Sequence, residues 1–188
     1  MPAMNSPVFA QGGYRPADAG HLYLDYEHLG PASGFTDEIF EIIDRIPLFE
    51  DMTRQEVECL CRYMGCYGAP RNASLLQEAE EGHFLLIILT GGVDVIKRTP
   101  QGISMVAEVG IGGMLGEMSL IDGAYRYASC VATRPTDFAV LTRTALNDIF
   151  VDHPRLGNKL LLLLLQLMTR RLRDTSNRLL PHLGGITV

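Results

Sequence analysis

The sequence of 188 residues lacks long apolar runs and an excess of positive charge. Its longest apolar stretch, residues 160–168, contains Gln166 and falls far short of the roughly 20 residues that a transmembrane helix requires. We therefore expect a buried helix face there and no membrane segment. The formal net charge of -6 at pH 7 and the isoelectric point near 5.3 also weigh against general affinity for nucleic acid or anionic membranes.

The sequence also lacks the residue patterns of disulfide, metal and catalytic sites. Its four cysteines have no repeated spacing, and its beginning has neither the basic start nor the apolar run of a signal peptide, so we expect a reducing cytoplasm. Cys59 and Cys61 fall in a helical pattern that points them apart, with no histidine nearby, which disfavours a metal site. No base accompanies a serine or cysteine nucleophile and no paired carboxylates occur, so we expect no catalytic residues, no cofactor and no enzyme.

The composition predicts one globular domain with extensions. The 47% hydrophobic content is sufficient for a core. Residues 1–35 hold several prolines and glycines without a sustained period, and we expect a flexible N-terminal arm there. Its scattered tyrosines and leucines suit either a latch onto its own domain or a docking segment for a partner. The domain itself is expected over residues 36–182, with a short tail at 183–188.

Helix signals stand on both sides of a β-rich region. Thr36 begins one predicted helix, and Thr53 with Glu56 forms a capping box for a second. Between about residues 64 and 143, short β-rich runs alternate with glycine and proline turns, the spacing of an antiparallel sandwich or barrel. A short helix near 144–150 and a long one over 153–180 follow, the latter with Pro154 in its first turn. We predict an α+β, mainly β fold: an eight-stranded antiparallel jelly-roll barrel with N-terminal helices and a long C-terminal helix.

The segment 113–132 carries the strongest chemical signal. Its glycines permit a tight backbone path, and the helical turn expected to begin at Glu117 has free N–H groups that attract phosphate. Nine residues later, Arg126 heads a predicted strand, and its guanidinium can grip two phosphate oxygens at once. Glu117 repels a phosphate but suits a ribose hydroxyl, because a carboxylate only accepts hydrogen bonds. A phosphate and a sugar hydroxyl together indicate a nucleotide.

This segment resembles the phosphate-binding cassette of the cyclic nucleotide-binding domain family, whose members include catabolite activator protein and protein kinase A regulatory subunits. The resemblance rests on Gly116 with Glu117, a short helix and Arg126 at the family's usual distance, and it extends over roughly residues 37–180. It implies a non-enzymatic receptor for a cyclic nucleotide, with cyclic AMP favoured over cyclic GMP. The implied ligand-binding residues are Leu115, Gly116, Glu117, Met118, Ser119, Arg126, Tyr127 and Ala128. At Tyr127 the family usually has a small or hydroxylated residue, and a tyrosine there suits stacking on the base, closure of the pocket or a different ligand.

The long C-terminal helix predicts an assembly surface. Its apolar residues at alternating steps of four and three make a coiled-coil seam: Leu161, Leu165, Met168, Leu172, Thr175, Leu179 and His182. A second set suits its own barrel: Leu160, Leu163, Leu164 and Leu167. Two apolar faces need two partners, so we expect a homodimer through this helix. The resemblance further implies that the helix closes over the purine, with Thr169, Arg170 and Arg173 as possible base contacts.

The expected function is therefore that of a stand-alone cytoplasmic sensor that transmits its signal to a protein partner. No DNA-binding domain is expected, because only residues 181–188 follow the long helix. Two alternatives stay open. One is a ligand-free dimerisation scaffold whose pocket Tyr127 fills, and the other is a sensor of a cyclic dinucleotide, which the arginines of the long helix suit.

Overall fold

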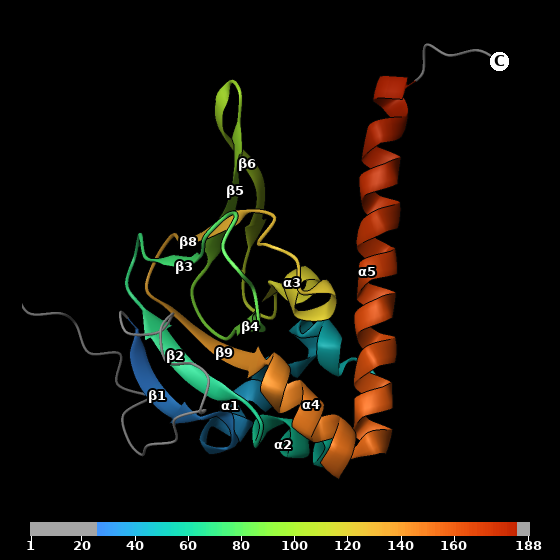
Figure 1. Ribbon diagram of the computed structural model, residues 1–188. Coiled ribbons are helices and arrows are strands. Elements are labelled where there is room, and N and C mark those ends of the chain that lie inside the picture. Colours follow the sequence, from blue (N-terminus) through green and yellow to red (C-terminus); the bar gives the residue numbers. More distant parts are fainter. Residues whose placement is uncertain (1–25, 184–188) are drawn as a thin grey trace, which may run out of the picture.

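Two antiparallel sheets and a group of helices make up residues 26–183, the part of the chain that the computed structural model describes (Figure 1). One sheet has five strands in the order β1-β2-β9-β4-β7, and the other has four in the order β3-β8-β5-β6. The strands are β1 (Glu27–Pro31), β2 (Gly65–Ala69), β3 (Ser74–Leu76), β4 (Phe84–Ile88), β5 (Val93–Thr99), β6 (Gly102–Val109), β7 (Met114–Leu115), β8 (Ser129–Ala132) and β9 (Thr136–Thr142). The prediction of a mainly β fold with a long C-terminal helix is confirmed.

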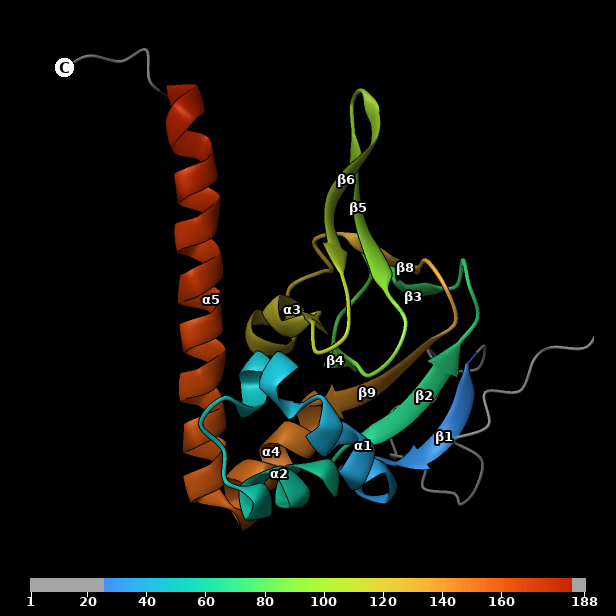
Figure 2. The same cartoon turned by 180° about the vertical axis from the view of Figure 1, so that it is seen from behind.

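Most of the helices gather at one end of the sheets, and the longest begins at that end and runs alongside the molecule toward the other end (Figures 1 and 2). They are α1 (Thr36–Glu41), α2 (Arg54–Cys61), α3 (Glu117–Asp122), α4 (Arg143–Asp152) and α5 (Pro154–Leu183), with short 3-10 turns η1 (Ala32–Phe35), η2 (Ile43–Arg45) and η3 (Pro47–Phe49). The predicted capping box at the start of α2 is present, with Thr53 and Glu56 bonded reciprocally. The first predicted helix is shorter than expected, because α1 ends at Glu41 and the chain continues into η2.

Strand β4 lies at the centre of the core and is buried on both faces. Side chains of successive strand residues point to opposite faces. Accordingly, Leu86 and Ile88 join the apolar cluster shared with strands of the second sheet, whereas Leu85 and Ile87 join the cluster shared with the helices. The five-stranded sheet is therefore covered by the second sheet on one face and by helices on the other.

The first strand corrects the predicted domain boundary and strand count. Residues 27–31 were expected in the N-terminal arm, but they form β1 and pair antiparallel with β2. The sequence hides this strand because Gly30 and Pro31 break its pattern, and the register shifts between His28 and Gly30. The described residues thus form nine strands instead of eight. Residues 1–25 of the expected arm and 184–188 of the expected tail lie outside the described residues.

Helix α5 is buried along its first part and exposed beyond it. Leu160, Leu163 and Leu164 are buried in the helical cluster, as the inner stripe predicted. In both views the second half of the helix stands beside the long β5–β6 hairpin, with α3 near its middle (Figures 1 and 2). Among the described residues, no helix has the length and apolar character needed to cross a membrane.

Candidate functional site

The predicted helical turn forms α3, directly after a left-handed glycine. Gly116 has a φ of 80°, a conformation that residues with a Cβ rarely adopt. A Cβ at this position would also lie 2.6 Å from Nη1 of Arg126. The glycine therefore serves both the turn and the close approach of the arginine.

Arg126 lies in the interior, with 4% of its surface exposed. Its Nη1 donates a hydrogen bond to the Gly116 carbonyl oxygen at 2.9 Å, and its guanidinium lies 4.4 Å from the centroid of the Phe84 ring. Its backbone N–H donates to the Glu80 carbonyl at 2.8 Å. These contacts from three segments fix the guanidinium at the start of α3.

Gly82 makes the room that the arginine needs. A Cβ on Gly82 would lie 2.4 Å from Cβ of Ser119 and 2.6 Å from Nε of Arg126. Atoms that close must move. The loop at residues 80–83 therefore supports both the buried Ser119 and Arg126 from behind.

A cavity of about 380 Å³ opens at this point, between the strands and α5, and we call it the α3 cavity. All eight residues predicted as ligand contacts, which fall at 115–119 and 126–128, are among its lining residues. Leu76, Val95 and Val109 supply an apolar wall from the strands. The site thus combines one buried cation and one buried carboxylate with an apolar surface, the usual make-up of a small-molecule pocket.

Tyr127 lies at the rim of the α3 cavity and does not fill it. Its side chain is largely exposed, and the Lys97 ammonium lies 3.6 Å from the centroid of its ring. The same ammonium donates to the Tyr127 carbonyl at 2.6 Å and pairs with Glu78 at 3.3 Å. The ring is therefore held in place by a cation on its face.

Glu117 is buried and forms an ion pair with Arg171 of α5. Its side chain is 3% exposed, whereas that of Arg171 is 49% exposed. Nη2 of Arg171 also donates to the Met114 carbonyl at 2.8 Å. Arg171 thus connects the long helix to the residues that begin the site, a contact that the sequence reasoning did not include.

The helix presents a different set of residues to the cavity from the set expected as base contacts. Thr169, Arg170 and Arg173 are not among its lining residues, and Arg170 pairs instead with Glu50 at 2.9 Å. The lining residues from α5 are Arg171, Asp174, Thr175 and Arg178. A signal for most of them was present in the sequence. The inner stripe of Leu160, Leu164 and Leu167, continued by the same steps of three and four, reaches Arg171, Asp174 and Arg178.

The remaining polar atoms of the cavity indicate binding more than reactivity. Burial raises the pKa of the Cys130 thiol to about 12, so this lining residue is a neutral thiol at physiological pH. Within residues 26–183, no group of three or more histidine, cysteine or carboxylate side chains is placed to hold a metal ion. The arrangement suits an anionic ligand with hydroxyl groups.

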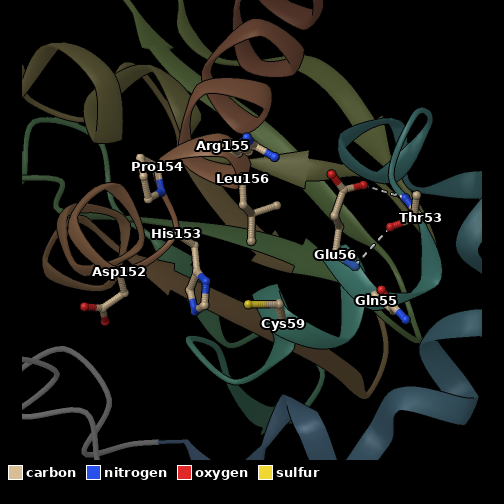
Figure 3. Close-up of a pocket in the computed structure, with 9 residues that line it drawn as sticks. All are labelled: Thr53, Gln55, Glu56, Cys59, Asp152, His153, Pro154, Arg155 and Leu156. Carbon is tan, nitrogen blue, oxygen red and sulfur yellow. Dashed lines mark hydrogen bonds between the residues drawn. The ribbon is translucent and has the colours of Figure 1, made fainter.

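A second hollow of about 560 Å³ lies between the start of α2 and the joint of α4 and α5 (Figure 3). Both carboxylates that line it already have hydrogen-bond partners. The Glu56 carboxylate accepts from the Thr53 N–H at 2.7 Å and from Lys159 at 2.8 Å, and the Lys159 hydrogen bond is the main cause that lowers the Glu56 pKa. Asp152 accepts from Tyr63 at 3.0 Å. These bonds connect α2, α4 and α5, so the hollow is part of the helical packing.

The two antiparallel sheets and the α3 cavity are those of a small-molecule-binding domain, and comparisons with known proteins identify its class. Residues 69–153 match the family described as the cyclic nucleotide-binding domain. A solved structure described as a cyclic nucleotide-binding domain from Methylobacillus flagellatus KT is 51% identical, with a TM-score of 0.78, over 89% of this chain and 95% of that one. This chain belongs to the cyclic nucleotide-binding domain family.

Two further relatives are bacterial regulators. The CRP-like cAMP-activated global transcriptional regulator of Mycobacterium tuberculosis is 29% identical over 140 residues, which cover 74% of this chain and 61% of that protein. The catabolite activator protein of Thermus thermophilus has a TM-score of 0.65 at 28% identity, over 71% of this chain and 61% of that one. The chain therefore spans about three-fifths of the length of these relatives.

Proposed function

We propose that this domain is a non-enzymatic receptor for a cyclic nucleotide, with cyclic AMP favoured over cyclic GMP. The observation that carries the proposal is the joint burial of Arg126 and Glu117 beside one cavity of about 380 Å³. A cyclic nucleotide carries one phosphate anion and one free ribose hydroxyl, the two groups that this pair of side chains can recognise. Family membership and the name of the cAMP-activated relative support the same ligand class.

Each ligand group has a complementary part of the cavity. Arg126 binds the phosphate through a charge-assisted contact, and Glu117 accepts a hydrogen bond from the ribose hydroxyl. The apolar wall around Val95 and Val109 contacts the sugar and the base. Asp174 of α5, which can only accept, suits an amino group on the purine.

Binding is converted into a signal by a shift between two arrangements of α5. In the structure, Arg171 of α5 and the ligand site share the Glu117 carboxylate. A ligand that bonds to Glu117 changes the partners available to Arg171, and so the free energy of docking α5 on the site changes. The shift is limited by the difference in ligand affinity between the two arrangements.

The outer surface of α5 supplies a route to other proteins. The seam predicted from the sequence is exposed in the single chain at Leu165, Leu172 and Leu179. Exposed apolar stripes of this kind are typical of association surfaces, and we propose a homodimer that signals to a further protein in the cytoplasm. Sedimentation velocity tests the dimer: Leu172→Asp should give monomers, whereas Leu180→Asp, an exposed position off the seam, should not. Monomeric wild-type protein at micromolar concentration would exclude this seam as the dimer interface.

A cyclic dinucleotide is the second candidate ligand. Arg171 and Arg178 line the same cavity as Arg126, so more than one cation is available to a ligand with two phosphates. Competition between mononucleotides and dinucleotides distinguishes the candidates.

Calorimetric titration of the full chain with cyclic AMP, cyclic GMP and cyclic di-GMP tests the proposal. Saturable binding that is lost in Arg126→Ala is the expected result, and the order of affinities identifies the ligand. No heat with any of the three, supported by unchanged melting temperatures, would favour the ligand-free scaffold.

A further inference from the structure

The last turn of α3 is held by a side chain from the first residue of α4. Nη2 of Arg143 donates hydrogen bonds to the carbonyl oxygens of Ser119 at 2.9 Å and Leu120 at 2.6 Å. The Ser119 carbonyl also accepts from the Gly123 N–H at 3.0 Å. Carbonyls in the last turn of a helix generally need partners from outside it, and a cation there also interacts favourably with the helix dipole. Arg143 therefore stabilises the end of α3 opposite to Glu117.

The surroundings of Arg143 fix its position. Its backbone N–H donates to the His83 carbonyl at 2.7 Å, next to the loop that supports Arg126. Its Nη1 packs against Gly123, where a Cβ would lie 3.1 Å away. Its Nε is buried without a hydrogen-bond partner among the described residues. The guanidinium thus leaves one donor unused, which is a cost, while it reaches the end of α3.

Helix α4 in turn packs closely on α5. A Cβ on Gly157 of α5 would lie 2.4 Å from the Phe150 ring of α4, so the two helices are in direct contact. Leu120 of α3, Ile149 of α4 and Leu160 of α5 belong to one buried cluster. A displacement of α3 therefore has a continuous path through Arg143 and α4 to the base of α5.

We infer that Arg143 is a positioning residue of this site, which holds α3 in place and couples ligand binding at residues 116–119 to α4 and α5. Arg143 is not among the lining residues of the α3 cavity, so it acts through α3. From the middle of α5, Arg171 binds the Glu117 carboxylate at the start of α3. From α4, Arg143 binds the Leu120 carbonyl near its end. The coupling part of this inference rests on the proposed nucleotide binding.

Hydrogen exchange of three variants, with and without saturating cyclic AMP, tests the inference. Arg143→Met keeps an unbranched apolar stem but removes the donors, and Arg143→Lys keeps the charge. Arg155→Met is the matched control, because Arg155 is an exposed arginine at the α4–α5 joint (Figure 3). In Arg143→Met without ligand, exchange of the α3 amides should rise about fivefold or more, since their opening free energy falls. With cyclic AMP, the change in exchange at α4 and the first half of α5 should drop to less than about half of the wild-type change.

The affinity for cyclic AMP separates coupling from a general loss of structure. Arg143→Met should bind with an affinity within about tenfold of wild type, because coupling energies are of this size, and Arg143→Lys should recover part of the exchange response at α5. A wild-type response at α4 and α5 in Arg143→Met would overturn the coupling. Equal increases in exchange at α3 and in the central strands β4 and β9 would show a general structural role instead.

Failure of the proposed function gives a different result from failure of the inference. If the wild-type protein binds no nucleotide, the proposed function fails, and the ligand-free comparison still decides the positioning role. Unchanged α3 exchange in Arg143→Met would then overturn it, whereas a selective rise at α3 would support it. If wild type binds and only the variant response is normal, the function stands and the coupling fails.

Discussion

The two walls of the α3 cavity are built differently. On the wall opposite α5, which we call the inner wall, Glu117 and Arg126 are almost fully buried, and Arg126 contacts Gly116 and Phe84. On the α5 side, Arg171 is half-exposed and Asp174 and Arg178 are exposed on a single helix. Electrostatic interactions are stronger where water is excluded, so the inner wall suits recognition of a charged ligand. The helix wall, which is more exposed to water and belongs to a single helix, suits movement in response to the ligand.

The largest expected effect on ligand affinity comes from a substitution in the inner wall, at Arg126. Arg126→Ala removes the proposed charge-assisted contact to the phosphate, and we expect a loss of about 2–4 kcal/mol, which corresponds to about 30-fold to nearly 1000-fold in affinity for cyclic AMP. Calorimetry measures the loss. Arg126→Lys should recover little, because an ammonium cannot reproduce the fork of a guanidinium.

Thermal melting is the control for Arg126, since its side chain also binds the Gly116 carbonyl. If a folded Arg126→Ala variant binds cyclic AMP within threefold of the wild-type affinity, Arg126 does not bind the ligand.

Gly82→Ala tests the same wall without deleting a polar group. Its new Cβ would meet Ser119 and Arg126 at 2.4–2.6 Å, so these residues must shift. Overpacking of this kind costs about 1–3 kcal/mol, and we expect at least about tenfold weaker nucleotide binding. Gly110→Ala is the matched control, because nothing lies within 4 Å of its Cβ position. Equal affinities of the two variants would show that the loop behind Arg126 does not support the site.

The charged part of the inner wall was predictable, because Glu117 and Arg126 are close together in the sequence. Glycines, a carboxylate and an arginine within residues 113–126 predict the turn that forms α3, and the family resemblance implied the eight positions that line the cavity. The strand expected to begin at Arg126 begins only at Ser129. That these residues bind a nucleotide is still a prediction. Strand β1 was not predicted, because Gly30 and Pro31 interrupt the residue pattern of a strand. Pairing with β2 stabilises it in the structure.

The helix wall was harder to predict, because which side of α5 faces the cavity is set by tertiary packing. Two apolar stripes on one helix were predicted from the sequence, and the family resemblance implied Thr169, Arg170 and Arg173 as base contacts. The contacts of Leu160, Leu163 and Leu164 with the helical cluster instead turn Arg171 toward Glu117. A rotation of about one residue, or 100°, separates the two sets.

Neighbouring arginines on α5 test the helix wall. Arg171→Met leaves the buried Glu117 carboxylate without its cation, and we expect a loss of about 1–2 kcal/mol in the free energy of unfolding, less than for a fully buried pair because Arg171 is half-exposed. Arg170→Met breaks an exposed pair with Glu50 and should cost about 0–1 kcal/mol. Urea denaturation measures both values.

Glu117→Gln completes a double-mutant cycle with Arg171→Met. The cost of Arg171→Met should shrink in the Glu117→Gln background, because the amide needs no counter-charge. Identical costs for Arg170→Met and Arg171→Met, with no coupling to Glu117, would contradict a specific contact between α5 and the site.

The smallest expected effect is at the rim between the two walls, at Tyr127. Lys97 holds the ring in position, so it can stack on a base with little loss of conformational entropy. Stacking is worth about 1–3 kcal/mol in single-strand binders, and the exposure of Tyr127 favours the lower end. Tyr127→Ala should therefore weaken cyclic AMP binding about fivefold, whereas Tyr125→Ala, an exposed tyrosine outside the cavity lining, should leave it unchanged. Tighter binding by Tyr127→Ala would mean that the ring obstructs the ligand, and the small residue usual in the family would then be the better fit to this cavity.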